Sequence, residues 1–256
     1  MTAPGTIAEV AGLIARAERL LFITGAGISA DSGLPTYRGV GGLYQDRHTA
    51  DDIPVEVALS GGMFEYRPAI TWKYIWQVGE ACVRARPNDA HRCLAALEAR
   101  KADVWVITQN VDGLHRAAGS RNLVEVHGHA FDLYCVACGQ ACDAQALING
   151  YGAPVELPPR CPSCGGIVRP DVVLFGEALS PRTMRAFRDL SSKSFDAVVS
   201  VGTSAVFPYI AKWVLDAQRT AVPTIEINPV GTELSEAFDH RIRMGAVDAV
   251  RALGLV

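Results

Sequence analysis

The sequence predicts an α/β fold, with a Rossmann-like parallel sheet, helices on both of its faces and a small zinc-binding insert. Three observations support this prediction: strand-like runs alternate with helix-like segments, a glycine-rich turn follows the first run, and two Cys-x-x-Cys motifs lie in a stretch with little apolar material. The chain has 256 residues, of which 49% are hydrophobic and 20% are charged. This length and composition favour one large domain with an insert over two equal domains.

Four short runs have the apolar and β-branched composition of strands that are buried on both faces of a sheet. They are LLFIT at 20–24, VWVIT at 104–108, AVVSV at 197–201 and TIEIN at 224–228. Helix-like sequence covers most of the first 20 residues and recurs at 89–100, 181–190 and 208–218. Strands that alternate with helices in this way are typical of a parallel sheet.

Charge and hydropathy bear on the cellular location of the protein and on its partners. A net charge of -3 provides no basic field for nucleic acid, and the chain contains no run of about 18 apolar residues that would predict a membrane span. Glu9 interrupts the apolar N-terminal stretch, which therefore resembles an amphipathic helix more than a signal peptide. We expect a monomeric, cytoplasmic protein that binds neither nucleic acid nor membranes.

The turn GAG at 25–27 directly follows the first strand-like run. Its glycines would let the backbone approach a phosphate, and the start of the following helix would present N–H groups to that anion. An unliganded turn is the alternative, and the acidic ribose partner of an ordinary dehydrogenase is not evident about 20 residues further on. The next loop, DSGLPTYRG, sets Tyr37 and Arg38 either over a bound cofactor or in solvent.

The second strand-like run ends in an unusual number of hydrogen-bonding side chains, in the sequence VWVITQNVDGLH at 104–115. These residues would suit a polar loop between a strand and a helix. They would equally suit a binding site, because ligands of α/β proteins lie beyond the carboxyl ends of the strands. His127 and His129 follow in VEVHGHAF, where a histidine can be a general base, a metal ligand or a packed core residue.

Five of the seven cysteines lie between residues 135 and 164. The motifs CVAC at 135–138 and CPSC at 161–164 are 22 residues apart and deliver four thiolates, which indicates a tetrahedral zinc site; redox or incidental thiols are the alternative. Four sulfur ligands leave no open position, so the metal should be structural. Cys142 is interpreted as a bystander that could replace a damaged ligand.

Two further segments, GGIVRPDVVLFGE at 165–177 and VGTSAVFPYI at 201–210, combine strand-like sequence with glycine. Their edges could pair with an extended peptide, or they could serve the fold alone. The stretch Gly202-Thr203-Ser204 could instead bind hydroxyl or phosphate groups of a cofactor.

Taken in order, GAGISADSGLPTYRG, TQNVDGLH, His127-Gly128, the paired Cys-x-x-Cys motifs, RPDVVLFGE, GTSAVFP and EINP resemble the sirtuin family over about residues 20–248. This resemblance implies an NAD-dependent protein lysine deacylase, in the first place a deacetylase, that transfers the acyl group to ADP-ribose and releases nicotinamide. It also implies one structural Zn²⁺. Mono-ADP-ribosyl transfer and a non-enzymatic, NAD-sensing zinc module are the alternatives.

The resemblance assigns roles to individual residues. His127 would be the general base, with Asn110 and Asp112 near the nicotinamide end. NAD would be lined by Gly25, Ala26, Tyr37, Arg38, Gln109, Asn110, Asp112, Gly202, Thr203, Ser204, Asn228 and Ala246. The acyl-lysine substrate would be lined by Ile75, Val78, Val172, Phe175, Gly176, Glu177 and Val206. Zinc would be held by Cys135, Cys138, Cys161 and Cys164.

The resemblance also implies a division of the chain. Residues 1–34, 80–130 and 168–256 would form the Rossmann-like domain that binds NAD. Residues 35–79 would form the cofactor-binding loop and a helical insert of the small domain, and residues 131–167 its zinc-binding module.

The sequence PTYRGVGG resembles the bacterial and mitochondrial branch of the family, some members of which bind acidic acyl groups through a Tyr-x-x-Arg pair. Counting back from Pro87-Asn88, that pair would fall at Ile75 and Val78, neither of which can bind a carboxylate. Burying an unpaired carboxylate is costly, so we expect weak activity on succinyl-lysine or malonyl-lysine. Acetyl or longer neutral chains should be preferred.

Overall fold

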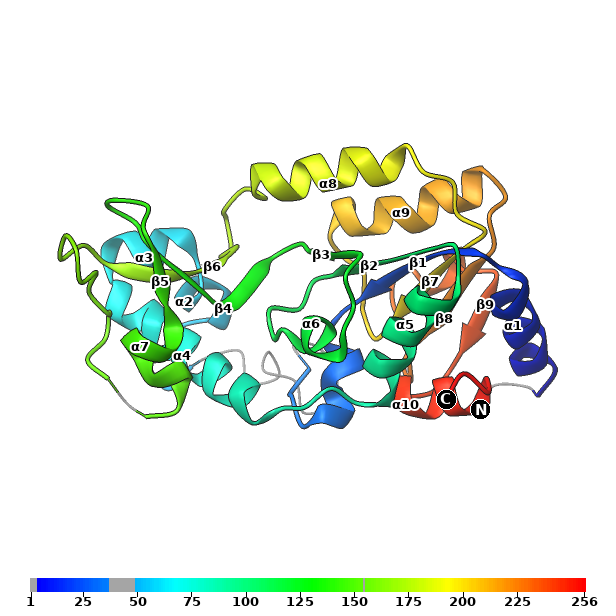
Figure 1. Ribbon diagram of the computed structural model, residues 1–256, viewed down its shortest axis with the longest axis horizontal. Coiled ribbons are helices and arrows are strands. Elements are labelled where there is room, and N and C mark those ends of the chain that lie inside the picture. The colour runs from blue at the N-terminus through cyan, green and yellow to red at the C-terminus, as the bar shows by residue number, and fades with distance from the viewer. Residues whose placement is uncertain (1–3, 37–48, 154) are drawn as a thin grey trace.

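The computed structural model describes residues 4–36, 49–153 and 155–256. The larger unit of the protein is built around a six-stranded main sheet with the order β3-β2-β1-β7-β8-β9 (Figure 1). Every neighbouring pair of strands in this sheet is parallel. The strands are β1 (Arg19–Thr24), β2 (Asp103–Thr108), β3 (Leu123–Glu125), β7 (Ala197–Val201), β8 (Thr224–Ile227) and β9 (His240–Ile242). The predicted α/β class is confirmed.

The four strands predicted from the sequence are β1, β2, β7 and β8. The edge strands β3 and β9 are not predicted, because three residues are too few to show a periodic pattern. The predicted helices are present as α1 (Pro4–Arg16), α5 (Asp89–Arg100), α8 (Pro181–Ser191) and α9 (Pro208–Arg219). Shorter helices are α6 (Leu114–Ala118) and α10 (Ala246–Ala252), with 3-10 turns at Ala26–Ser32, Asn149–Tyr151 and Ser235–Ala237.

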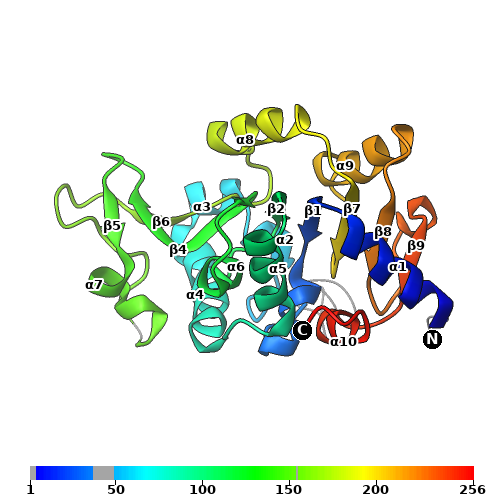
Figure 2. The same ribbon diagram turned by 45° about the vertical axis from the view of Figure 1, so that its right-hand side comes forward.

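Helices cover both faces of the main sheet (Figure 2). Alternate residues of β1 point to opposite faces, so Leu20 and Phe22 belong to one apolar core and Leu21 and Ile23 to the other. The first core is closed by α1, α5 and α10, and the second by α8 and α9. Burial on both faces is the reason why these strands consist almost wholly of apolar residues. In the described part of the chain, no helix has both the length and the apolar character that crossing a membrane requires.

A smaller module lies beside the main sheet (Figure 1). Its antiparallel sheet has the order β5-β4-β6 and consists of β4 (Gly128–Cys135), β5 (Ala141–Asp143) and β6 (Val168–Val172). The helices α2 (Val55–Ala58), α3 (Gly61–Tyr66), α4 (Pro68–Arg84) and α7 (Ala144–Ile148) complete it. The module has its own apolar core, in which the Trp72 indole N–H donates to the carbonyl oxygen of Val168 at 2.8 Å.

Strand β6 belongs to the smaller module both by its sheet and by its core. It pairs with β4, and Val168 and Leu174 pack in the core of the module. We therefore propose that the chain returns to the larger unit between Glu177 and Pro181, rather than at residue 168. Val83 of α4 also packs against this core, so we propose that the helical part of the module extends beyond residue 79.

Candidate active site

The carboxyl ends of β2, β1 and β7 lie side by side, because these strands are neighbours in a parallel sheet. The backbone N–H of Gln109 donates to the carbonyl oxygen of Thr24 at 3.0 Å, and that of Gly25 donates to the carbonyl oxygen of Val201 at 3.2 Å. Three sequence motifs that are about 80 residues or more apart along the chain therefore meet at one edge of the sheet.

The glycine-rich turn after β1 packs against the turn after β7. The N–H of Gly27 donates to the carbonyl oxygen of Gly202 at 2.8 Å. A Cβ atom on Gly27 would lie 2.6 Å from the Cα of Gly202, and one on Gly25 would lie 2.6 Å from the Cβ of Thr203. Gly202 itself has a φ of +59°, in the left-handed region. Glycine is thus required here so that the two turns can approach each other.

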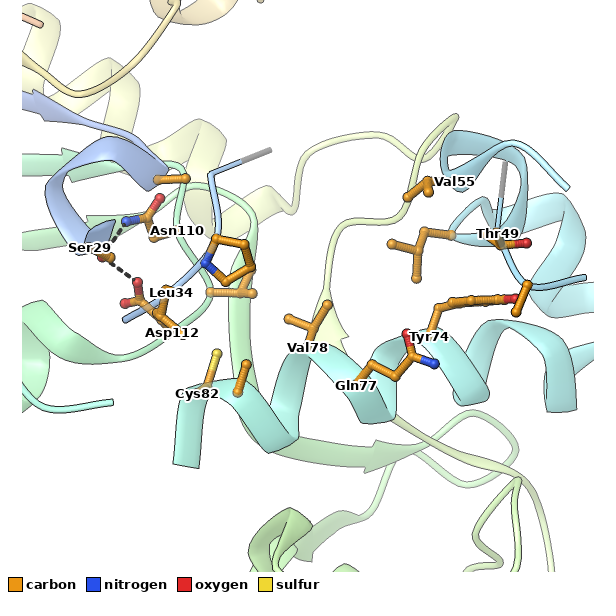
Figure 3. A pocket seen from close by; sticks show the side chains of 16 residues that line it. Ser29, Leu34, Thr49, Val55, Tyr74, Gln77, Val78, Cys82, Asn110 and Asp112 are labelled. Carbon is orange, nitrogen blue, oxygen red and sulfur yellow. Dashed lines mark hydrogen bonds between the residues drawn. The ribbon is translucent and has the colours of Figure 1, made fainter. Parts of the chain in front are cut away.

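Asn110 and Asp112 are buried beyond the end of β2 and are joined by Ser29 (Figure 3). The Asn110 carboxamide donates to the carbonyl oxygen of Gly25 at 3.1 Å and to the Ser29 hydroxyl at 3.2 Å. The Ser29 hydroxyl donates to an Asp112 carboxylate oxygen at 2.7 Å. Burial raises the pKa of Asp112. Sequence reasoning missed Ser29, since nothing in its local pattern indicates that it contacts residues more than 80 positions away.

A layer of histidines lies beneath this cluster. The Nε2 atom of His115 is 2.9 Å from the Thr24 hydroxyl, and the Nε2 atom of His91 is 3.4 Å from that of Ser29. The two imidazole rings meet edge to face at 4.8 Å between centroids. Burial lowers the pKa of His91 to about 4 and that of His115 to about 3. Both are therefore neutral near pH 7, and the base of the site carries no imidazolium charge.

His127 lies in the turn between β3 and β4, facing the end of β2. Its Nδ1 atom is 3.0 Å from the backbone carbonyl oxygen of Gln109. A carbonyl can only accept a hydrogen bond, so we assign the proton to Nδ1, which leaves a lone pair on Nε2. Burial lowers the pKa of His127, and the imidazole is neutral near pH 7. His129 differs, because its Nδ1 atom accepts from the backbone N–H of Phe131 at 3.2 Å.

Other residues predicted to bind the cofactor converge on Thr203. Its hydroxyl accepts from the Gln109 carboxamide at 2.7 Å, and its carbonyl oxygen accepts from the Asn228 carboxamide at 3.2 Å. Ser204 is half-buried next to it, whereas Ala246 is buried at the start of α10 in the apolar core of the sheet. Tyr37 and Arg38 lie outside the described residues.

A cavity of about 250 Å³ opens between this cluster and α4 (Figure 3). Asn110 and Asp112 line one end, and Val78, one of the predicted substrate residues, lines the α4 side. Ile75 does not line the cavity and packs in the core of the smaller module. Tyr74 and Gln77 line it instead. Positions 74, 77, 78 and 81 form one stripe along a helix, and position 75 lies on the inner side of that stripe.

The predicted substrate segment, residues 172–177, runs past His127 toward α3. The N–H of Val173 donates to the carbonyl oxygen of His127 at 2.9 Å, and Phe175 exchanges backbone hydrogen bonds of 3.0 Å with Leu59 and Gly61. The Glu177 carboxylate accepts from the Arg169 guanidinium at 2.6 and 3.0 Å. Glu177 therefore anchors the end of this segment, and Val172 and Gly176 flank the paired part. Val206, also predicted, is half-buried between β7 and α9.

The four predicted metal ligands come together in the smaller module. The sulfur atoms of Cys135, Cys138, Cys161 and Cys164 all lie within 4.8 Å of one another. Two of their separations are 3.5 Å and 3.9 Å, close to the value of about 3.8 Å that a tetrahedron with Zn–S bonds of about 2.3 Å requires. The donor set and its spacing thus fit a single structural Zn²⁺. Cys142 is outside this group, and its thiol lies 3.6 Å from the carbonyl oxygen of Gln140.

These features define a class of protein: a dinucleotide-binding α/β protein with a four-cysteine zinc module and a half-buried histidine at the strand ends. The Sir2 family model matches residues 25–208, and the chain belongs to the Sir2 family. The resemblance to sirtuins is confirmed.

Named relatives cover nearly the whole chain. The chain is 47% identical over 251 residues to NAD-dependent protein deacylase 2 of Pseudomonas aeruginosa, covering 97% of this chain and 96% of that protein. It is 38% identical over 252 residues to NAD-dependent protein deacylase of Aeropyrum pernix, covering 96% and 97%. A solved structure of Sir2 with a deacetylated p53 peptide and 3′-O-acetyl ADP-ribose has a TM-score of 0.85 at 28% identity, covering 96% of each chain.

Proposed function

We propose that this protein is an NAD-dependent protein lysine deacylase that transfers the acyl group of an acyl-lysine to ADP-ribose and releases nicotinamide. Membership of the Sir2 family and relatives named as deacylases support this activity. Sir2 structures with a p53 peptide, with NAD⁺ or with acetyl ADP-ribose support acyl-lysine proteins or peptides as partners. The cytoplasmic location, the monomeric state and the lack of a nucleic-acid partner stay predictions from the sequence.

The observation that carries this proposal is the state of His127. Its Nδ1 proton is held by the Gln109 carbonyl oxygen, and burial lowers its pKa, so Nε2 can accept a proton near pH 7. Asn110 and Asp112 lie beyond the end of the same strand, as a neutral carboxamide and a buried carboxyl group. This combination suits a reaction at a sugar carbon in which positive charge develops and a hydroxyl group later loses its proton.

Bound NAD would supply a ribose that becomes electrophilic when nicotinamide leaves. We propose that Asn110 and Asp112 orient the nicotinamide end and that His127 accepts the proton of a ribose hydroxyl. Because Ser29 and backbone groups fix these side chains in advance, they need little rearrangement when charge develops. The cofactor set proposed from the sequence, which includes residues outside the described part of the chain, is Gly25, Ala26, Tyr37, Arg38, Gln109, Gly202, Thr203, Ser204, Asn228 and Ala246.

For the peptide we propose that residues 172–177 and Val206 provide the strand edges that bind its backbone. The acyl chain would enter the cavity beside α4. Among the described residues that line this cavity there is no Lys or Arg, and the nearby Asp51 carboxylate already binds the hydroxyl of Tyr74 and the ammonium group of Lys73. A carboxylate on the acyl group would find no cationic partner among these residues. We therefore propose that the enzyme is in the first place a deacetylase.

An acyl-peptide panel assayed with and without NAD tests this function. Wild-type protein should release nicotinamide and form O-acyl ADP-ribose from acetyl-lysine peptide only when NAD is present. His127→Ala should lose turnover by about 10²–10⁴-fold and keep its fold, whereas His240→Ala, on β9, should remain active. Labelled ADP-ribose that moves onto protein without deacylation, or NAD binding with no turnover of any peptide, would contradict the proposal.

A further inference from the structure

Tyr209 contacts the proposed general base. It lies in the first turn of α9, and its hydroxyl is 2.8 Å from the Nε2 atom of His127. Since Nδ1 carries the imidazole proton toward the Gln109 carbonyl oxygen, Nε2 has only a lone pair to offer. In this arrangement the Tyr209 hydroxyl donates and Nε2 accepts. The nitrogen that would take a proton from the ribose is thus already hydrogen-bonded.

Aromatic contacts hold Tyr209 in this position. Its ring stacks on Phe207, with 5.3 Å between the centroids and an angle of 10° between the planes. The His127 ring meets both of these rings edge to face, at 5.6 Å from Phe207 and 6.0 Å from Tyr209. Burial raises the pKa of Tyr209, so its hydroxyl keeps its proton near pH 7 and remains a donor. The hydrogen bond is therefore a feature of a packed three-ring cluster and not of a freely rotating side chain.

We propose that Tyr209 is a positioning residue for the general base. In the free enzyme its hydroxyl donates a hydrogen bond to the Nε2 lone pair of His127, and this hydrogen bond must break when NAD binds. An imidazole nitrogen has one in-plane lone pair, which cannot accept from two donors with good geometry. A ribose hydroxyl and the Tyr209 hydroxyl therefore compete for the same atom. This inference rests on the proposed function, which makes His127 the base that engages the ribose.

If this hydrogen bond competes with NAD, removing the Tyr209 hydroxyl should strengthen NAD binding. Tyr209→Phe keeps the ring and its stacking on Phe207 but removes the donor. The Kd of NAD measured by calorimetry should fall about fivefold, which corresponds to the net strength of one hydrogen bond, and kcat/KM for NAD should rise by a similar factor. Tyr134→Phe, on β4 of the smaller module, is the matched control and should bind NAD like the wild type.

A double-mutant cycle shows whether the effect passes through His127. In a His127→Ala background there is no lone pair to hold, so adding Tyr209→Phe should leave the Kd unchanged. An unchanged or weaker affinity in the single variant, or an equal gain in both backgrounds, would overturn the proposal. A loss of kcat in Tyr209→Phe without a gain in affinity would also overturn it, since Tyr209 would then carry the proton. Because the cycle measures binding, a wild-type protein without deacylase activity would refute the proposed function and leave this result interpretable.

Discussion

Acidification below about pH 6.5 should destabilise this protein, because the imidazoles of His91 and His115 are buried in their neutral form beneath the site. Burial lowers the pKa of His91 from 6.5 to about 4 and that of His115 from 6.5 to about 3. Between about pH 6.5 and pH 4 these two histidines therefore bind two protons in the unfolded chain that they do not bind in the folded chain. His127 and His129, whose pKa values burial also lowers, act in the same direction. The free energy of unfolding should rise with pH across this window and level off above it.

The size of the effect follows from these values. At about pH 5, each histidine lowers the free energy of unfolding by about 2 kcal/mol relative to pH 7.5, and the pair by about 4 kcal/mol. The pair should contribute about 2.5 kcal/mol per pH unit to the slope near pH 5, or somewhat more than 1 kcal/mol per pH unit for each histidine. Asp112 opposes this trend, because burial raises its pKa and the folded chain takes up its proton first. With a total stability on the order of 5–15 kcal/mol, such a loss is large.

Urea unfolding at several pH values between about 5 and 7.5 measures this slope. His115→Gln can keep a hydrogen bond with the Thr24 hydroxyl but cannot titrate, so the slope should fall by about 1.3 kcal/mol per pH unit. His240→Gln controls for the loss of a histidine elsewhere on the sheet. A free energy of unfolding that stays level across this range, or a full slope in His115→Gln, would refute the reasoning.

Three further perturbations test the site and its support. Gly27→Ala forces a Cβ atom to within 2.6 Å of the Cα of Gly202. NAD binding, measured by calorimetry, should be lost, and the free energy of unfolding should fall by about 2 kcal/mol. An unchanged Kd would show that the turn can move to accommodate the methyl group. Arg169→Met leaves the Glu177 carboxylate without its bidentate partner, and KM for the acyl-peptide should rise about tenfold while the Kd of NAD holds; equal losses of both would contradict this. Acetyl-lysine peptide should have a kcat/KM at least about tenfold above that of succinyl-lysine peptide in a matched assay, and the reverse order would show that a cation reaches the acyl cavity.

The fold could be predicted where long patterns repeat. Strands of four to six residues between helices carry enough apolar sequence to be recognised, and the paired Cys-x-x-Cys motifs identify the zinc module without any structure. The three-residue edge strands carry no such pattern. The sequence could not assign β6 to a sheet either. A strand near the end of an insert can belong to the sheet of the insert or to the main sheet. Its antiparallel pairing with β4 decides the matter.

The site could be predicted where motifs name the residues, and not where packing selects them. Asn110, Asp112 and His127 follow from the order of motifs along the chain, and the structure brings them to the same strand ends. Ser29 and Tyr209 have roles that exist only through contacts with residues more than 80 positions away. Counting back from Pro87-Asn88 identifies the right part of α4. It cannot tell whether Tyr74 or Ile75 faces the cavity. Only the rotation of the packed helix decides that.

The position of His127 depends on both parts of the molecule. Its carbonyl oxygen accepts from Val173, directly after β6 of the smaller module, while its Nδ1 proton goes to Gln109 at the end of β2. The Gln109 carboxamide in turn donates to Thr203 after β7. Since β6 pairs with β4, which ends in the first zinc ligand, Cys135, loss of the metal should disturb the base through this route. A zinc ion with four sulfur ligands has no position for a substrate. It should nevertheless affect the proposed proton transfer, because the strands next to it help to fix the backbone of His127.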